Sequence, residues 1–330
     1  MKTQSMFKTA VILLLALSLA VPINRVGASD SEAQAIKDAR EEAQKAFEAL
    51  LETYNAGGNV SELEATLNEA LSLISQAEME VGKNPEEAER LASEAGRLAQ
   101  EVLGEAPNVR DEGLMRRQTA TIVTVASIAG LVVAGGLVYF FGPDILWRIW
   151  VWLRRNYRVK VKGSARKTEA SCFTMEHACA AVLALMLIIA AVGAYQFFMG
   201  GRISEAFSEL GVLGPGMKLA DYPKETVAGE AVRLYAYIGN HMGKPMYYTV
   251  MIKIGDNETA VNPAPVEPVA KLERVMLHDE NWTSPVDITL TKPGLNQRII
   301  FEPWMYNETT RQVQYHERWC QIWVNVTAPP

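Results

Sequence analysis

The residue types that carry most enzyme chemistry form no recognisable catalytic pattern in this chain. Three of its four histidines, His241, His278 and His316, lie in polar segments and lack the spacing of metal ligands. The sequence has neither a Gly-x-Ser-x-Gly turn nor an HExxH helix, the patterns of two large hydrolase classes. We therefore predict no enzyme activity, no catalytic residue, no metal site and no cofactor.

The three cysteines argue against a metal centre and against a disulfide. Cys172 and Cys179 flank His177 at the start of an apolar run, and a metal centre would need a fourth ligand and tighter spacing. Cys320 lies beyond that run, so it cannot pair with either of them across a membrane. We expect these side chains to share no chemistry.

Five Asn-x-Ser/Thr sequons mark candidate glycosylation sites, and their positions bear on topology. They begin at Asn59, Asn257, Asn281, Asn307 and Asn325. Such sites are glycosylated on surface segments of secreted or exported parts of a chain. The segments that contain them are therefore expected to be extracytoplasmic.

A basic and aromatic segment predicts contact with lipid. It directly follows a long apolar run and contains three tryptophans among arginines. Tryptophan prefers the headgroup level of a bilayer and arginine prefers anionic lipid, so the segment is expected to lie on the inner leaflet. The neighbouring apolar run favours lipid over nucleic acid, which also binds such stretches. The expected lipid-interface residues are Trp147, Arg148, Trp150, Trp152, Arg154, Arg155, Arg158, Lys160 and Lys162.

Four aromatic residues near the C-terminus form a candidate docking surface. Successive side chains of a strand alternate between core and solvent. If Asn325 faces water, Trp319 and Trp323 share its face. The same alternation turns Tyr235 and Tyr237 outward. An outward aromatic set suits a glycan or a protein partner, and the alternative is a loop or a membrane-proximal linker that covers it.

Two uncharged runs organise the chain. Residues 118–143 and 178–201 carry no charged side chain, and each exceeds the roughly 20 apolar residues that cross a bilayer. We predict transmembrane helices at 118–141 and 177–201. The 142–176 loop holds eight basic and three acidic residues, so the positive-inside rule places it in the cytoplasm. Both termini are then extracytoplasmic.

Small residues on the predicted spans indicate close helix packing. Ala126, Gly130 and Ala134 follow one another at four-residue spacing, and Ala180 and Ala184 do so in the second span. The two helices are expected to pack on each other, with a helix-helix oligomer as the alternative. Neither uncharged run, 118–143 or 178–201, contains an acidic or basic side chain, which argues against a transport path within this chain.

The N-terminal part predicts a signal peptide followed by a helical bundle. Lys2 and Lys8 precede a short apolar run that ends at the small residues of 26–28, so we predict a signal peptide at 1–28, with an uncleaved anchor as the alternative. Apolar residues then recur at helical spacing. We predict an extracytoplasmic three-helix bundle at 29–104 and a linker at 105–117.

Start and stop signals divide that bundle into its helices. The predicted starts are Ser29 with Glu32, Ser61 with Glu64, and Asn84-Pro85, and the predicted stops are Gly57-Gly58, Gly82 and Gly104. Residues 29–118 contain 20 acidic and nine basic side chains. The acidic faces are expected to be solvated, and the alternative is docking of a basic partner or cations.

The apolar period changes to two beyond Arg202, which is typical of strands. We predict strands at 231–238, 246–254, 266–277, 286–291, 297–301 and 319–326. Strands of this number and length favour an all-β immunoglobulin-like sandwich at 202–330. The predicted fold class is a multi-domain membrane protein with a small all-α bundle, a two-helix transmembrane hairpin and a C-terminal sandwich.

The C-terminal segments resemble a known membrane-protein family. FSELGVLGPGMKLADYP at 207–223, Gly229-Glu230, IGNHMGKPMYYTV at 238–250 and CQIWVNV at 320–326 are similar to the archaeal family of domain of unknown function 1616. The resemblance implies an extracytoplasmic sandwich after several membrane helices, whereas this chain has two predicted spans and an added bundle. It supplies no catalytic residues, so His241 is expected to be a turn residue.

Together these features predict a non-enzymatic, glycosylated protein of the archaeal cell surface. We expect an interaction or structural module anchored in the cell membrane, with a surface protein or glycan as partner and anionic lipid on the inner side. The alternative is an accessory subunit of a membrane enzyme or transporter that assembles envelope or glycan components.

Overall fold

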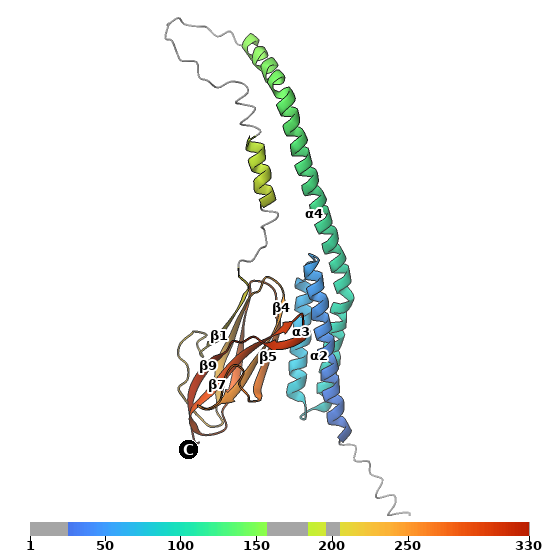
Figure 1. The fold of residues 1–330 in the computed structure, drawn as a ribbon. Helices are drawn as coiled ribbons and strands as arrows, with labels where there is room; N and C mark the ends of the chain where they lie inside the picture. The colour runs from blue at the N-terminus through green and yellow to red at the C-terminus, as the bar shows by residue number, and fades with distance from the viewer. Residues whose placement is uncertain (1–25, 157–183, 196–204, 330) are drawn as a thin grey trace, which may run out of the picture. The chain divides into compact units, whose positions relative to one another are not determined.

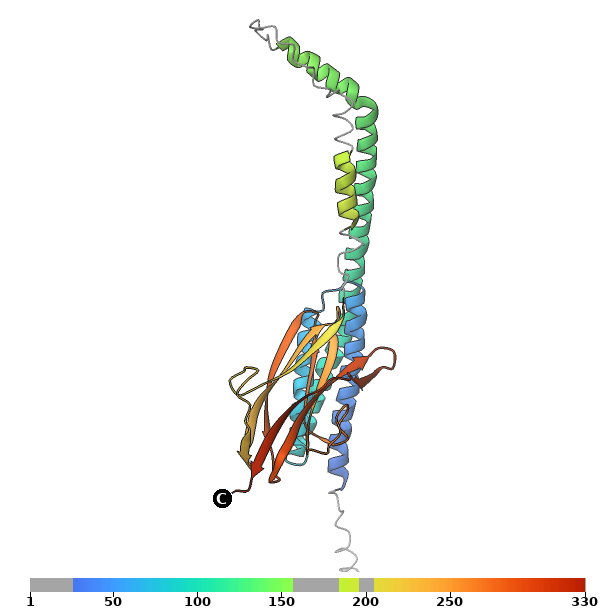
Figure 2. The ribbon, with the colours of Figure 1, turned by 60° about the vertical axis from the view of Figure 1, so that its left-hand side comes forward.

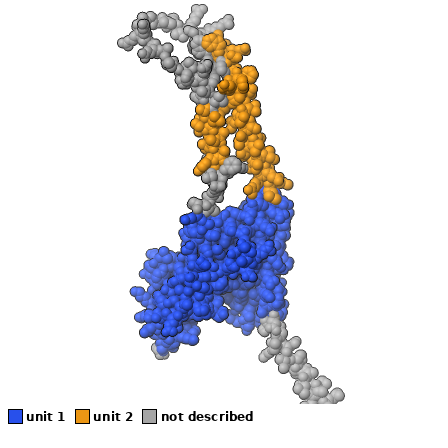
Figure 3. All heavy atoms as spheres, in the orientation of Figure 1, with its two compact units in different colours: residues 1–113, 205–330 blue, residues 114–204 orange. Residues whose placement is uncertain are grey.

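The structure is a computed structural model, and it describes residues 26–156, 184–195 and 205–329. The chain divides into two compact units, residues 1–113 with 205–330 and residues 114–204 (Figure 3). The helix α4 (Pro85–Asn156) contributes to both units. The first unit contains all the strands that the structure describes (Figure 1).

The predicted N-terminal helices are confirmed. They are α2 (Val26–Asn55), α3 (Ser61–Glu80) and the first part of α4. Gly57 and Gly82 have φ values of 89° and 75°, which glycine adopts without strain, and both follow the end of a helix. Asn84 accepts a hydrogen bond from the Glu87 backbone N–H at 3.4 Å, as expected for a cap before a proline.

The predicted stop at Gly104 and the 105–117 linker are wrong, because α4 continues through both. Ala106 is buried in the core of the helices, and Val109 packs against it. At Gly113 the chain passes so close to the α2–α3 turn that an added Cβ would lie 2.3 Å from the Gly58 backbone nitrogen. Tertiary packing therefore holds this polar segment in a helix despite its weak local propensity.

Two further boundaries differ from prediction. α2 begins at Val26, before the predicted cap at Ser29, and Glu32 is buried instead of capping a helix end. α4 runs past Gly142-Pro143 to Asn156, so the predicted helix break after 141 is not observed.

The C-terminal part forms two sheets, as predicted (Figure 1). The smaller has the order β1-β3-β6, and the larger has the order β2-β9-β7-β4-β5, with β8 paired to β7. β2 runs parallel to β9 and the other pairs are antiparallel. The strands are β1 (Phe207–Leu213), β2 (Glu225–Val227), β3 (Ala231–His241), β4 (Met246–Gly255), β5 (Pro268–Met276), β6 (Glu280–Thr289), β7 (Gly294–Asn307), β8 (Gln312–Tyr315) and β9 (Cys320–Thr327).

A continuous apolar core separates the two sheets. Leu234 and Ile238 of β3 and Ile288 of β6 enter it from the smaller sheet. Ile252 and Phe301 enter it from the larger sheet. The alternation predicted for β3 is therefore observed, with its even-numbered apolar residues inside.

Strands β1, β2 and β8 are additional to those predicted, and β6 begins before its predicted start at 286. The first half of β6 contains Asn281 and Pro285, which resemble turn residues in the sequence. Pro285 pairs with Tyr235 in an antiparallel register, so the segment is held as a strand by its neighbour.

The helices and the sheets are not separate domains, contrary to the domain division drawn from the sequence. They share one compact unit, in which the helices cover the outer face of the larger sheet (Figure 2). Phe47 of α2 contacts the rings of Tyr247 and Tyr306, with centroids 5.8 and 5.3 Å away. Val275 of β5 belongs to the same buried cluster. A sheet with two apolar faces must be covered on both, which explains the association.

A buried ion pair lies beside this apolar contact. Nη1 of Arg40, on α2, lies 2.6 Å from each carboxylate oxygen of Glu273, on β5. Nζ of Lys271 lies 2.9 Å from the same carboxylate. Burial opposes ionisation of Glu273, but Arg40 and Lys271 outweigh it and lower the pKa of the carboxyl group. The Tyr247 hydroxyl also donates to Glu273 at 2.8 Å.

Helix α3 closes the edge of the larger sheet. Asn68 donates to the Val275 carbonyl at 2.9 Å and accepts from the Val275 N–H at 2.8 Å, so one side chain satisfies both backbone groups of an edge residue. Asn68 also donates to Glu64. Burial, and to a lesser extent Glu280, raises the pKa of Glu64 to about 7, while Arg274 acts in the opposite direction.

The second unit contains the rest of α4 and a helix at Ala184–Tyr195. α4 is long and apolar enough to cross a membrane, and its apolar window is almost entirely exposed. The shorter helix covers only part of the predicted 177–201 span, whose remainder lies outside the described residues. One membrane-spanning helix is therefore supported, and the second remains a prediction.

Removal of the partly buried Arg40 cation tests the contact between helices and sheet. We expect Arg40→Met to lower the free energy of unfolding by about 3 kcal/mol, because Glu273 would keep its charge with only Lys271 nearby. Thermal unfolding of the full chain in detergent measures the change. Arg97→Met, which removes solvent-exposed ion pairs, is the control and should leave the midpoint nearly unchanged. Equal effects of the two substitutions would contradict the assignment.

The raised pKa of Glu64 predicts a pH-dependent stability. Its folded pKa of about 7 lies above its ordinary value of 4.5, so its contribution is fully present below about pH 4.5 and is lost as pH rises through 7. Glu64→Gln should therefore raise the melting temperature at about pH 9 and leave it unchanged near pH 4. The exposed Glu62→Gln is the control. A stabilisation that is independent of pH would rule out this cause.

Candidate functional site

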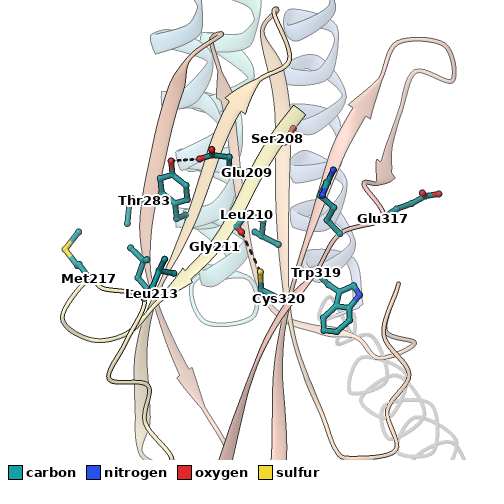
Figure 4. A pocket seen from close by; sticks show the side chains of 13 residues that line it. Ser208, Glu209, Leu210, Gly211, Leu213, Met217, Thr283, Glu317, Trp319 and Cys320 are labelled. Carbon is teal, nitrogen blue, oxygen red and sulfur yellow. Dashed lines mark hydrogen bonds between the residues drawn. The ribbon is translucent and has the colours of Figure 1, made fainter. Parts of the chain in front are cut away.

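An open hollow of about 970 Å³ lies where β1 approaches the start of β9 (Figure 4). Gly211 of β1 forms its floor, because a residue without a side chain leaves this part of the sheet bare. A Cβ at Gly211 would lie 3.5 Å from Cδ1 of Tyr237, which is an ordinary contact distance. The backbone therefore forms the floor of the hollow, and the volume above it can hold side chains of a ligand.

One wall is a cluster of polar side chains on the smaller sheet. The Tyr237 hydroxyl lies 2.9 Å from Glu209 and 2.9 Å from the side-chain oxygen of Asn281, and it can donate to one at a time. The hydrogen bond to Glu209 raises the pKa of Tyr237, since it favours the protonated phenol. These groups converge over Gly239, where a Cβ would lie 2.9 Å from Asn281. A side chain at that position would displace the Asn281 and Glu209 side chains from Tyr237.

The opposite wall comes from the segment that leads into β9. It contains Trp319, which is 37% exposed, and Cys320, whose thiol donates to the Leu210 carbonyl at 3.6 Å. Burial raises the pKa of Cys320, so the thiol stays protonated at neutral pH and is a weak nucleophile. This wall offers contact area rather than reactive chemistry.

A loop with exposed apolar side chains borders the hollow. Met217 and Leu219 are 56% and 73% exposed. Two backbone hydrogen bonds hold the loop. The Gly214 N–H donates to the Lys218 carbonyl at 2.8 Å, and the Met217 N–H donates to the Gly214 carbonyl at 2.9 Å. A Cβ at Gly214 would lie 2.2 Å from the Ala220 carbonyl oxygen, so the loop requires glycine there.

The histidines have structural surroundings. His241 ends β3, with Nδ1 2.9 Å from Asp279 and its ring stacked on Phe207. His278 lies 3.6 Å from Asp279. Burial lowers the pKa of His316, which keeps its imidazole neutral. In the part of the chain that the structure describes, no three His, Cys, Asp or Glu residues could hold a metal ion together.

The structure brings together two of the four predicted docking residues. Tyr237 and Trp319 line the same hollow. Tyr235 lies on the same strand as Tyr237, two residues away, and is outside the lining. Trp323 belongs to the larger sheet, where the Arg298 guanidinium lies 4.4 Å from its ring. Alternation within one strand could not reveal which strands share a sheet, so the four were grouped too broadly.

The sequons differ in the freedom of their side chains. Asn257 and Asn281 are exposed. Asn307 donates through its amide nitrogen to Gln314 at 2.9 Å and accepts from two backbone N–H groups. Asn325 accepts from the Asn296 N–H, and Asn59 accepts from Ser61 at the start of α3. Asn257 is thus the most accessible acceptor and Asn307 the most constrained.

Part of the predicted lipid-interface segment lies on α4. Trp147 and Trp152 are 59% and 62% exposed there, beside Arg148. The side chains of Trp150, Arg154 and Arg155 lie outside the described parts, as do Arg158, Lys160 and Lys162 altogether. Contact of these residues with lipid stays a prediction.

Sequence reasoning missed the residues that define the hollow. Glu209, Gly211 and Leu219 all lie in the FSELGVLGPGMKLADYP motif, which was noticed only for its resemblance. The only sign of the hollow in this motif was a pair of glycines on either side of a short apolar run. The IGNH motif has a structural role, since the buried Asn240 donates to the carbonyls of Lys244, Met276 and Leu277.

The residues that line the hollow lie within a segment that matches a protein-family model. Residues 202–325 match the family model of DUF1616, a domain of unknown function. The DUF1616 segment begins just before β1 and ends within β9, so it includes every residue of the hollow and excludes the helices. The comparison with curated proteins gave no match.

Similar solved structures cover less than half of this chain. A β-glucosidase from Listeria innocua is 15% identical at a TM-score of 0.25, over 39% of this chain and 17% of the enzyme chain. A CARDB domain from Pyrococcus furiosus, solved with di-metal ions, is 11% identical at a TM-score of 0.27, over 38% of this chain and 92% of the CARDB chain. A chain of the human zinc 2-glycoprotein complex with prolactin inducible protein is 8% identical at a TM-score of 0.26, over 38% of this chain and 98% of that chain. Scores this low assign no function.

Proposed function

We propose that this chain is a non-enzymatic interaction protein of the cell surface, in which the DUF1616 segment is the docking module. The observation that supports this role is the hollow over Gly211 with its preformed rim. Met217 and Leu219 are exposed on a loop that is held by its own hydrogen bonds. Exposed apolar side chains on a fixed loop cost solubility, and they are typical of a surface that a partner covers.

Membrane anchoring supports the same role. α4 can cross a membrane, and we propose that the 177–201 run returns through it to form a hairpin. The eight basic residues of segment 142–176, part of which belongs to α4, support a cytoplasmic location for this segment on anionic lipid. Both termini and the DUF1616 segment are then extracytoplasmic, where the sequons can be glycosylated.

Glycan mapping tests this topology. We expect glycans on the extracytoplasmic sequons, with occupancy highest at the exposed Asn257 and lowest at Asn307, whose amide is engaged. Protease treatment of intact cells should leave the 154–167 loop uncut until the membrane is permeabilised. Mass spectrometry reads both. Cleavage of this loop in intact cells would overturn the orientation.

A second candidate function is that of an accessory subunit in a membrane enzyme or transporter complex. An apolar groove of about 330 Å³ in the second unit favours it, because Gly135 and Gly136 of α4 face Met186 and Ala190 there. Small residues allow another helix to approach closely. A membrane partner would occupy this groove, whereas a surface partner would occupy the hollow.

Site-specific crosslinking separates these roles. A photo-reactive amino acid in place of Leu219 should crosslink to another cell-surface component in intact cells, whereas the same group in place of Leu295 should not. Leu295 is the matched control, since it is 79% exposed and lies outside the hollow. Crosslinks only from Gly136, in the membrane groove, would favour the accessory subunit. No crosslink from Leu219 would reject the docking role.

A further inference from the structure

We infer that the hollow binds a protein segment that presents an apolar side chain next to a lysine or arginine. This inference rests on the docking function proposed above and specifies its ligand. Neither the match to DUF1616 nor the similar structures assign a ligand to this surface.

The floor and walls suit an apolar side chain. Gly211 leaves an open area near Trp319 (Figure 4), and Tyr237 also lines the hollow. A volume of about 970 Å³ holds several side chains, and an anchor placed there would contact an aromatic ring of the lining. Such an anchor gains from leaving water, because much of the lining is apolar.

The rim favours protein over carbohydrate. Its most exposed members, Met217 and Leu219, are aliphatic and offer no hydrogen bonds to sugar hydroxyls. Methionine is frequent on surfaces that adapt to protein partners. The loop is preformed, so a partner would not need to order it on binding.

The charges around the hollow call for a basic residue beside that anchor. Glu209 and Glu317 both line it, against one cation, Arg318. The side chain of Glu209 is 43% exposed, and its carboxylate lies 3.8 Å from Nε2 of His241. A carboxylate in this half-exposed position attracts a basic residue and would set the orientation of the segment.

Pairing of the segment with β1 as an added strand is not the mode of binding. The Leu210 carbonyl, on the free edge of β1, already accepts from Cys320, and the Val212 carbonyl accepts from Tyr222 at 2.7 Å. Two outward carbonyls of this edge are therefore occupied. Recognition must rest on side chains rather than on a backbone ladder.

The test selects binders from a random peptide library on the full chain in lipid nanodiscs. Selected peptides should contain a large apolar residue next to lysine or arginine. Gly211→Leu should weaken their binding about tenfold or more, since the added side chain fills the floor. Gly104→Leu is the matched control, because Gly104 lies on an exposed part of α4 outside the hollow and a Cβ there meets nothing within 4 Å. Leu219→Ala, a surface change that leaves folding intact, should also weaken binding, unlike Leu295→Ala.

The charge element is tested with the same peptides. Glu209→Gln should weaken binding of the basic peptide and leave a lysine-to-methionine peptide unaffected, a coupling that a double-mutant cycle measures. Peptides insensitive to Gly211→Leu and Leu219→Ala, or equal binding by both peptides, would overturn the inference. A glycan or a lipid vesicle that competes at the hollow would also overturn it. Crosslinks from Leu219 to such a component would still support the docking function.

Discussion

The association of Arg40 with Glu273 is the contact on which the arrangement of the first unit depends. The Glu273 carboxylate of the edge strand β5 has only 4% of its side chain exposed, so its charge needs nearby cations, and the sheet itself supplies only Lys271. Arg40 comes from a helix 233 residues away in the chain. The apolar contact of Phe47 with Tyr247 and Tyr306 adjoins this pair, because the Tyr247 hydroxyl donates to Glu273. Helices and sheets are consequently one folded body rather than two tethered domains.

This cover decides which surface remains free. The helices occupy the outer face of the larger sheet around Tyr247, and a loop occupies it around Lys253, which donates to the Ala264 carbonyl at 2.7 Å. Glu302, fully buried, lies 2.8 Å from Lys253 and accepts from the Ala264 N–H. The smaller sheet has no comparable cover among the described residues, and the hollow over Gly211 lies beside it. A partner therefore meets the smaller sheet and the rim loop.

Local patterns predicted the elements of this molecule well where packing agrees with propensity. The apolar stripe of α2, including Phe47 and Leu50, and the alternation of β3 were correctly assigned to the core. The sequence failed where tertiary contacts overrule local signals. Gly104 suggested a helix end, yet burial of Ala106 keeps α4 continuous.

The candidate site was less predictable, because it is formed by residues that meet only after folding. Tyr237 and Trp319 were expected to face outward, and their convergence depends on β1, a strand that was not predicted. Nothing in the sequence indicated the contact between Arg40 and Glu273, since charge alone does not reveal a partner far away in sequence. The role of a glycine such as Gly211 can be recognised only once its neighbours in the fold are known.

Hydrogen exchange on the full chain in nanodiscs tests most directly whether helices and sheets form one body. Amides of α2, α3, β4 and β5 should share one free energy of opening, because loss of the Arg40–Glu273 contact exposes both sides together. Exchange of the helices at a much lower free energy than the strands would contradict a single body. It would also mean that the outer face of the larger sheet is open to partners.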